Sequence, residues 1–572
     1  MNFVKVNFGL FICISSLLIL FLLNLPVNLS VLCSNENQGF AFTFGQGLLL
    51  WKELACGRGI LFVSLFAIIL KTFGFNTYSI IAVHIIETII LLLIGILIYL
   101  IVSKIAENNF WGGLSTAFWV IMISTPIGAS DLKVEILSHY NLNEENLCVL
   151  FSLSSLFCLV LSDFFDLNQK TTTAIKQNIF SFLAGVLAVC SLMSKANGAI
   201  LLIGTLLWLV LLCIFRKQDF KSLSGKILFY FFGVVLSLFF FNILLYMLGG
   251  DLINTWKDYF FLGSYTQEHL TSMKLLLSMF LKFMTRYTNS LSNFTLFLFG
   301  LLLFTAGILK GLFQRSKRNI FTNFLLIIGI WGIGNVCVII APGAYQPYYY
   351  HLIWPSLAIV FSLGLHDISK KVNKRLMMYL TLGISLFFVV RISIVTLPHI
   401  KLAKELMETN IFNQPQCFQD PVLPYSDLTN RRAFLQLADK INILLPKKDS
   451  TFYILNFDRQ GVAFGFIPTT YIYSKRYSPT TVDSSLLGIP NIIESKVKVL
   501  KNDLVKRLPE LLVVSGNIYL ESWQIKYLSD FIKWFSRYLK DNYNFETTFN
   551  YLEISGTGGT KTFYVYRKKS TF

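Results

Sequence analysis

Long apolar runs separated by short polar stretches dominate the first two thirds of the chain. A helix that crosses a bilayer needs about 20 mostly apolar residues. Eleven segments meet this requirement and predict a polytopic α-helical membrane protein. The first has some features of a signal peptide, but no cleavage site of small residues follows it, so we expect an uncleaved anchor. The predicted spans are 8–25, 78–103, 110–127, 146–163, 178–193, 197–215, 227–249, 291–310, 320–341, 349–366 and 376–397.

The apolar segment 59–75 is short and contains Lys71. If it were a span, every later loop would change sides. With this segment lying on the membrane, five short loops contain fifteen Lys and Arg residues, and the longer opposite loops contain nine. Since positive charge gathers on the cytoplasmic side, the basic loops and the N-terminus are predicted to be cytoplasmic. Segments 59–75 and 273–288 are then interfacial helices on the outer face.

The pattern changes after residue 397. Charged residues make up about 10% of residues 1–397 and about 22% of residues 398–572, close to the roughly 25% of an average soluble protein. This predicts two domains, a transmembrane domain of residues 1–397 and a small α/β domain of residues 398–572 outside the cytoplasm. Helical patterns cover 431–445, 494–508 and 523–541, and strand patterns cover 451–456, 511–514, 547–554 and 561–566.

The net charge of +18 does not indicate nucleic-acid binding, because the basic residues lie in short clusters between apolar runs. The nine cysteines show no paired spacing, and no Cys/His cluster indicates a metal. We therefore predict neither a metal nor a cofactor. One polar pair lies within a span: His84 and Glu87 are three residues apart on one helix face, which favours a structural pair inside the bundle.

Other polar groups gather in the predicted outer loops, where they are candidates for binding and catalysis. Carboxylates can act as bases, Lys and Arg can bind phosphate, and aromatic faces can stack on sugars or isoprenoid chains. The alternative is that these loops are polar because water surrounds them. The candidates are residues 34–40, Glu53, Arg58, residues 131–145, Lys195, residues 251–269 and residues 342–351.

The order and spacing of these loop motifs resemble the bacterial membrane glycosyltransferases of glycosyltransferase family 39, which have the GT-C fold and include protein O-mannosyltransferases and aminoarabinose transferases. No single motif is specific, but the resemblance extends over almost the whole chain. It is carried by Gly39-Phe40 with Gly45-Gln46-Gly47-Leu48-Leu49, by Glu53 with Gly57-Arg58-Gly59, by Leu142-Asn143-Glu144-Glu145, by Lys195-Ala196-Asn197-Gly198, and by Tyr348-Tyr349-Tyr350-His351 before Trp354-Pro355.

The resemblance implies transfer of a sugar from a polyprenyl-phosphate donor to a lipid, glycan or protein acceptor at the outer leaflet of the inner membrane. The reaction would invert the anomeric centre, with a loop carboxylate as base. One departure matters, because Asn37 and Gln38 stand where the family has an acidic pair. We therefore expect Glu36 as base. The other implied roles are Glu53 and Glu145 as supporting or alternative acids, Arg58 and Lys195 as ligands of the donor phosphate, and Asn37, Gln38, Glu144, Tyr349, Tyr350 and His351 lining the cavity.

Two alternatives remain at the level of sequence. A catalytically inactive relative that acts as a binding or assembly subunit is consistent with Asn37 and Gln38, because an amide cannot accept a proton from a hydroxyl at neutral pH. A flippase or transporter of the same lipid-linked sugar predicts functional polar residues within the spans, such as His84 and Glu87. The expected partners are a polyprenyl-phosphate-linked sugar, membrane lipids and the acceptor, with no nucleic acid.

Overall fold

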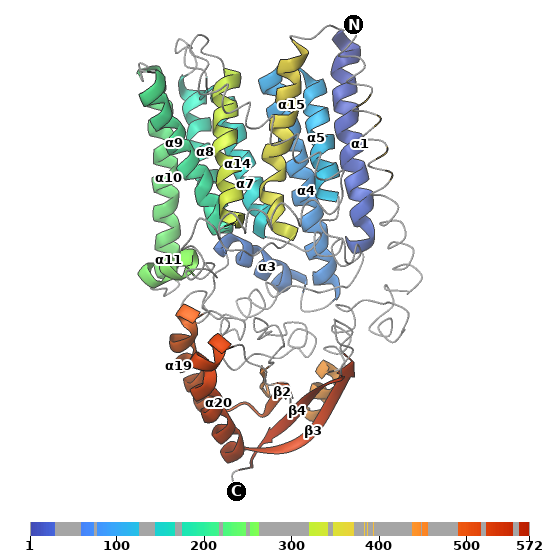
Figure 1. Ribbon diagram of the computed structural model, residues 1–572, viewed down its shortest axis with the longest axis vertical. Helices are drawn as coiled ribbons and strands as arrows, with labels where there is room; N and C mark the ends of the chain where they lie inside the picture. The colour runs from blue at the N-terminus through green and yellow to red at the C-terminus, as the bar shows by residue number, and fades with distance from the viewer. Residues whose placement is uncertain are drawn as a thin grey trace. The chain divides into compact units, whose positions relative to one another are not determined.

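The computed structural model forms two compact units (Figure 1). The first contains Met1–Leu29, His84–Leu244 and Ser264–Glu408, and the second contains Ser30–Val83, Leu245–Gly263 and Thr409–Phe572. The residues described are 2–28, 59–73, 77–124, 144–165, 174–216, 221–247, 252–261, 320–340, 347–370, 383, 386, 390, 393, 437–447, 449–455, 490–515, 522–552 and 560–570.

Apolar helices make up the first unit, as the hydrophobic pattern predicts. Six of the described helices are long and apolar enough to cross a membrane. Nine predicted spans correspond to described helices, 291–310 lies outside the described residues, and only four residues of 376–397 are described. The helices are α1 (Asn2–Asn28), α4 (Thr77–Ala106), α5 (Asn109–Ser124), α7 (Glu144–Leu161), α8 (Ala174–Ser194), α9 (Ala199–Arg216), α10 (Lys221–Met247), α14 (Ile320–Ile340) and α15 (Trp354–Ser369).

Helix α7 packs along α8, α1 packs against α5, and α5 packs against α15. Hydroxyl groups join α7 to α8 near the end of the bundle where α7 begins. Ser191 donates from Oγ to the carbonyl of Cys148 at 2.9 Å, and its Oγ lies 2.7 Å from that of Ser152. Since polar groups inside a membrane bundle need partners on neighbouring helices, these bonds fix how α7 lies along α8.

Close backbone contact between α8 and α10 depends on glycine. A Cβ atom at Gly185 would lie 2.1 Å from the carbonyl oxygen of Tyr230, and one at Gly233 would lie 2.3 Å from that of Phe182. Both distances are far below van der Waals contact, and the obstructing atoms belong to the backbone. Small residues at such crossings let transmembrane helices approach closely.

We expect Gly185→Ala to destabilise the protein by about 1–3 kcal/mol, the usual cost of overpacking a filled interface. Gly225→Ala on α10 is a matched control, because its added Cβ would lie 3.6 Å from Asn178 Oδ1 in ordinary contact. Thermal unfolding of the two variants in the same detergent tests this. Equal melting temperatures would mean that α8 and α10 do not pack as described.

Besides the C-terminal segments, the start of α4 and the end of α10, the second unit contains two short helices, α3 (Ile60–Phe73) and α11 (Leu252–Phe261). Helix α3 is the segment that the charge distribution places on the membrane surface. Its 14 residues give a length of about 21 Å, less than the roughly 30 Å of a hydrocarbon core. Its location at the interface stays a prediction, and the second predicted interfacial helix, 273–288, lies outside the described residues.

The C-terminal segments form a four-stranded sheet in the order β1-β2-β4-β3. Strands β1 (Phe452–Leu455) and β2 (Leu511–Ser515) are parallel, and β4 (Thr560–Lys568) pairs antiparallel with β2 and with β3 (Tyr543–Leu552). Helices α19 (Pro490–Arg507) and α20 (Ser522–Asn542) supply leucines and aromatic residues to a core shared with β1 and β2. The predicted helices and strands of this segment are confirmed, except that β3 begins at Tyr543 and not at residue 547, and residues 437–444 are the described part of the first helix.

Two buried tyrosines join α20 to α19 and the start of β3 to the segment before β2. Tyr538 donates from its hydroxyl to the carbonyl of Leu504, and Tyr543 donates to the carbonyl of Pro509, both at 2.7 Å. Burial raises the pKa of both phenols above the ordinary value, which keeps them neutral donors. The division at residue 397 and the location of this domain outside the cytoplasm stay predictions.

Candidate active site

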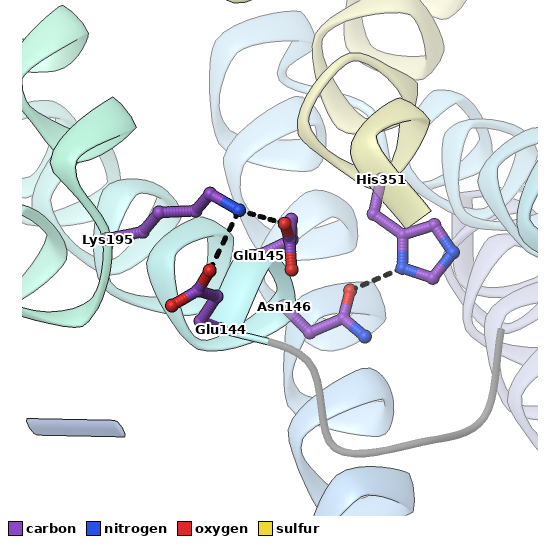
Figure 2. A network of polar contacts seen from close by, with 5 residues as sticks. All are labelled: Glu144, Glu145, Asn146, Lys195 and His351. Atoms are coloured by element: carbon purple, nitrogen blue, oxygen red, sulfur yellow. Dashed lines mark hydrogen bonds and ion pairs between the residues drawn. The ribbon is translucent and has the colours of Figure 1, made fainter. Parts of the chain in front are cut away.

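Buried charged and amide side chains meet at one end of the helix bundle, around the first turn of α7 (Figure 2). The turn supplies Glu144, Glu145 and Asn146. Two short 3-10 helices contact α7: η1 (Ala196–Gly198), which joins α8 to α9, and η2 (Pro347–Leu352), which precedes α15. Every residue of this cluster belongs to the first unit.

Lys195 lies between two carboxylates. Its Nζ donates to Glu144 Oε1 at 3.1 Å and to Glu145 Oε1. The Lys195 side chain is 10% exposed, and those of Glu144 and Glu145 are 5% and 2% exposed. Buried charges are stable only when they are paired and hydrogen bonded, so the two acids and the lysine stabilise one another.

The local sequence explains the position of each of these three groups. Glu144 and Glu145 stand in the first turn of α7, where the positive end of the helix dipole favours carboxylates. Lys195 has an extended backbone directly after α8, and its carbonyl accepts from the N–H of Gly198 at 2.8 Å to close the η1 turn. A Cβ atom at Gly198 would lie 2.3 Å from the backbone of Ser191, so the turn requires glycine. The corner thereby directs Lys195 toward α7.

A second polar chain runs through Asn146 on the other side of α7. Asn146 donates from Nδ2 to Glu87 Oε1 on α4, and its Oδ1 lies 2.7 Å from His351 Nδ1 in η2. An amide oxygen only accepts, so Nδ1 of His351 carries the proton in this bond. The amide therefore joins α4, α7 and η2, and it fixes which ring nitrogen of His351 donates.

We expect Asn146→Leu to lower the melting temperature, with a destabilisation of about 1–3 kcal/mol, because Glu87 and His351 each lose a buried partner. Asn178→Leu, near the start of α8 and half-buried, is the control for replacing an amide and should change stability by about 0.5 kcal/mol. A double-mutant cycle with His351→Phe measures the coupling. Additive effects of the two changes would show that the Asn146–His351 bond is absent.

The structure brings together several residues that the sequence singled out separately. Glu144, Glu145, Lys195 and His351 are all buried in this cluster. Tyr350 is also buried and stacks on Trp354, with ring centroids 6.0 Å apart. The structure describes only the backbone of Tyr349, which lies in η2. Five predicted site residues lie outside the described residues: Glu36, Asn37, Gln38, Glu53 and Arg58.

Two members of the cluster were missed as site residues. Glu87 was predicted to form a structural pair with His84, and both side chains are buried as expected. Its bond to Asn146 links it to the cluster as well. Asn146 directly follows the Leu-Asn-Glu-Glu run, but an amide adds no charge and does not stand out in a sequence. Within the part of the chain that the structure describes, no three His, Cys, Asp or Glu side chains are grouped to hold a metal ion.

No protein-family model and no curated protein matches this sequence. The oligosaccharyltransferase of Archaeoglobus fulgidus in its apo form has a similar structure, with a TM-score of 0.50 and 14% identity over 90% of this chain and 70% of that chain. The Archaeoglobus fulgidus oligosaccharyltransferase AglB, in complex with an inhibitory peptide and a dolichol-phosphate, gives a TM-score of 0.50 and 14% identity, over 97% of this chain and 74% of that chain. ArnT from Cupriavidus metallidurans, in the apo state, gives a TM-score of 0.48 and 12% identity, over 98% of each chain.

The two oligosaccharyltransferase structures show the fold of this chain. It has the GT-C fold, in agreement with the fold predicted from the loop motifs. Because the identity is low, this similarity carries no residue roles, and none of the matches assigns the chain to family 39.

Proposed function

We propose that this chain is a membrane glycosyltransferase that transfers a sugar from a polyprenyl-phosphate donor to an acceptor hydroxyl or amine at the outer leaflet, with inversion at the anomeric carbon. The observation that carries the proposal is the buried Glu144–Glu145–Lys195 cluster at one end of a GT-C bundle. A base for the acceptor proton and a cation for the leaving phosphate are what this transfer requires, and the cluster contains both. The match to an oligosaccharyltransferase solved with dolichol-phosphate supports a lipid-phosphate donor.

The reaction needs a base and a cation. A carboxylate takes the proton of the acceptor as the acceptor atom bonds to the anomeric carbon, and the bond from that carbon to the phosphate oxygen breaks. Polyprenyl phosphate leaves with the bonding electrons, and a cation stabilises its charge. We assign the base to Glu145 and the cation to Lys195. Arg58 is a second phosphate ligand in the proposal, and Glu36 and Glu53 stay alternative bases.

The direction of the helices supports an outer-face site. Glu145 and Lys195 lie where α7 begins and α8 ends. The described basic residues at the opposite ends of these and neighbouring helices include Lys104 at the end of α4, Lys226 near the start of α10 and Lys370 after α15. Positive charge marks the cytoplasmic side, so the Glu145 end faces outward in the proposal.

A reporter fused after residue 572 tests this orientation. We expect an enzyme that is active only outside the cytoplasm to function there, and one that is active only in the cytoplasm to fail. The opposite result would place the C-terminal domain in the cytoplasm, and an outer-face site would then require a different topology.

The function itself is tested by reconstituting the purified protein in liposomes with radiolabelled sugars on polyprenyl phosphate and with membrane-extracted acceptors. We expect transfer of label that depends on the protein. Binding of the donor without transfer would favour the inactive relative, in line with Asn37 and Gln38. Movement of intact donor between leaflets without transfer would favour a flippase.

A further inference from the structure

We infer that Lys195 is a donor-operated switch on the catalytic base: it holds Glu145 in an ion pair until the phosphate of the lipid donor takes its place. This inference rests on the proposed function and adds how the site is regulated. Donor binding and base activation would then be one event, and the base would be released only when a sugar is ready to react.

The first observation is the charge balance. Two carboxylates share one ammonium group, which gives Glu144, Glu145 and Lys195 a formal charge of −1. Glu87 adds another carboxylate to the same turn through Asn146. A phosphate therefore enters a site whose cation is already bound to acids, and it must compete with them. Lys195 and Glu145 cannot serve donor and acceptor while they remain bound to each other.

The second observation is accessibility. The side chain of Glu145 is 2% exposed, so its carboxylate cannot contact an acceptor hydroxyl in the observed arrangement. The Lys195 side chain is 10% exposed, more than those of either acid. Among these three residues, the lysine is thus the most exposed and the one we propose an incoming anion contacts. Lysine is a flexible point charge whose long side chain can change partners without a change in the backbone.

The third step is electrostatic. An adjacent cation makes a carboxylate a weaker base, and an adjacent anion makes it a stronger one. When phosphate takes Lys195, Glu145 loses its cation and gains a neighbouring anion, so both effects increase its basicity. Among the described residues, the other charged or titratable groups linked to this turn are Glu144 on α7, Glu87 on α4 and His351 in η2. Glu144 acts in the same direction as the phosphate.

Thermodynamic linkage makes this measurable without turnover. If phosphate binding strengthens Glu145 as a base, a proton on Glu145 strengthens phosphate binding by the same factor. The probe is the methyl diester of a short polyprenyl phosphate, which carries one negative charge that does not titrate near neutral pH. Calorimetric titration of the full-length protein in two buffers with different ionisation enthalpies gives both Kd and the number of protons taken up.

We expect the wild type to take up a fraction of a proton when the diester binds. Glu145→Gln should take up none and should bind at least about fivefold more tightly, because one competing carboxylate is gone. Glu144→Gln is the matched control, which should also bind more tightly but retain proton uptake. Lys195→Met should bind the diester at least about fivefold more weakly. Lys195→Arg keeps the positive charge and serves if Lys195→Met does not fold. It should bind the diester with measurable proton uptake.

Three results would overturn the inference. In the first, the diester binds without proton uptake and Glu145→Gln binds it with unchanged affinity. This would show that Lys195 does not change partners, and the proposed function would stand. Uptake lost in Glu144→Gln and retained in Glu145→Gln would assign the released acid to Glu144. Absence of diester binding in the wild type and in every variant would contradict the proposed function itself, and with it the switch.

Discussion

We expect Glu145→Gln to lower kcat for sugar transfer by about 10²- to 10⁴-fold, the usual contribution of a general base. The amide retains the size of the side chain and one hydrogen bond to Lys195 but cannot accept the proton of the acceptor. The donor should still bind, so the loss should appear in kcat. Single-turnover transfer from a radiolabelled polyprenyl-phosphate sugar measures this step directly.

Glu107→Gln is the control for removing a carboxylate, because Glu107 is exposed at the end of α4, opposite the Glu87 end. It should transfer sugar at the wild-type rate. If Glu145→Gln also does so, Glu145 is not the base, and Glu36→Gln and Glu53→Gln in the same assay decide between the two predicted alternatives.

We expect Lys195→Met to be the most destabilising single change in the bundle. It leaves two buried carboxylates without their shared cation, and removing one partner of a buried ion pair typically costs about 3–5 kcal/mol. The side chain of methionine fills a similar volume, so lost packing contributes little. Thermal unfolding in detergent, followed by tryptophan fluorescence, measures the loss.

A second substitution that removes a carboxylate from the Lys195→Met variant separates the contribution of charge to the lost stability from that of packing. Lys195→Met with Glu145→Gln should recover part of the lost stability, since one fewer buried charge lacks a cation. Lys195→Met with Glu107→Gln should recover none. Equal melting temperatures for these two double variants would show that Lys195 and Glu145 are not coupled.

Hydrophobic pattern alone was sufficient to predict the bundle, because in a membrane every span must be apolar over its whole length. The described helices correspond to nine of the predicted spans. It was also sufficient for the four strands of the C-terminal domain, because β1 and β2 are short apolar runs and apolar and polar residues alternate along much of β3. Strand β3 begins at Tyr543, earlier than predicted, directly after α20 ends at Asn542. A tertiary bond from Tyr543 to Pro509 stabilises that start, and no local pattern contains this information.

The composition of the cluster was harder to predict. Glu144, Glu145, Lys195 and His351 stood out because polar and ionisable side chains are costly at membrane depth. Their partners did not, because Asn146 and Glu87 are 59 positions apart and their bond depends on how α4 lies beside α7. The pairing of Lys195 with both acids likewise depends on the η1 corner directing it toward α7. Such distances are set by packing, which a single sequence does not specify.

The position of the donor phosphate is the most direct test of the central claim, that the cluster at the start of α7 is the centre of sugar transfer. A polyprenyl phosphate with a diazirine next to the phosphate can be crosslinked to the reconstituted protein, and the labelled residues identified by mass spectrometry. We predict labelling of the first turn of α7, residues 144–148, and of the corner at 195–198. Labelling confined to the opposite end of the bundle, around Lys104 and Lys226, would contradict the account.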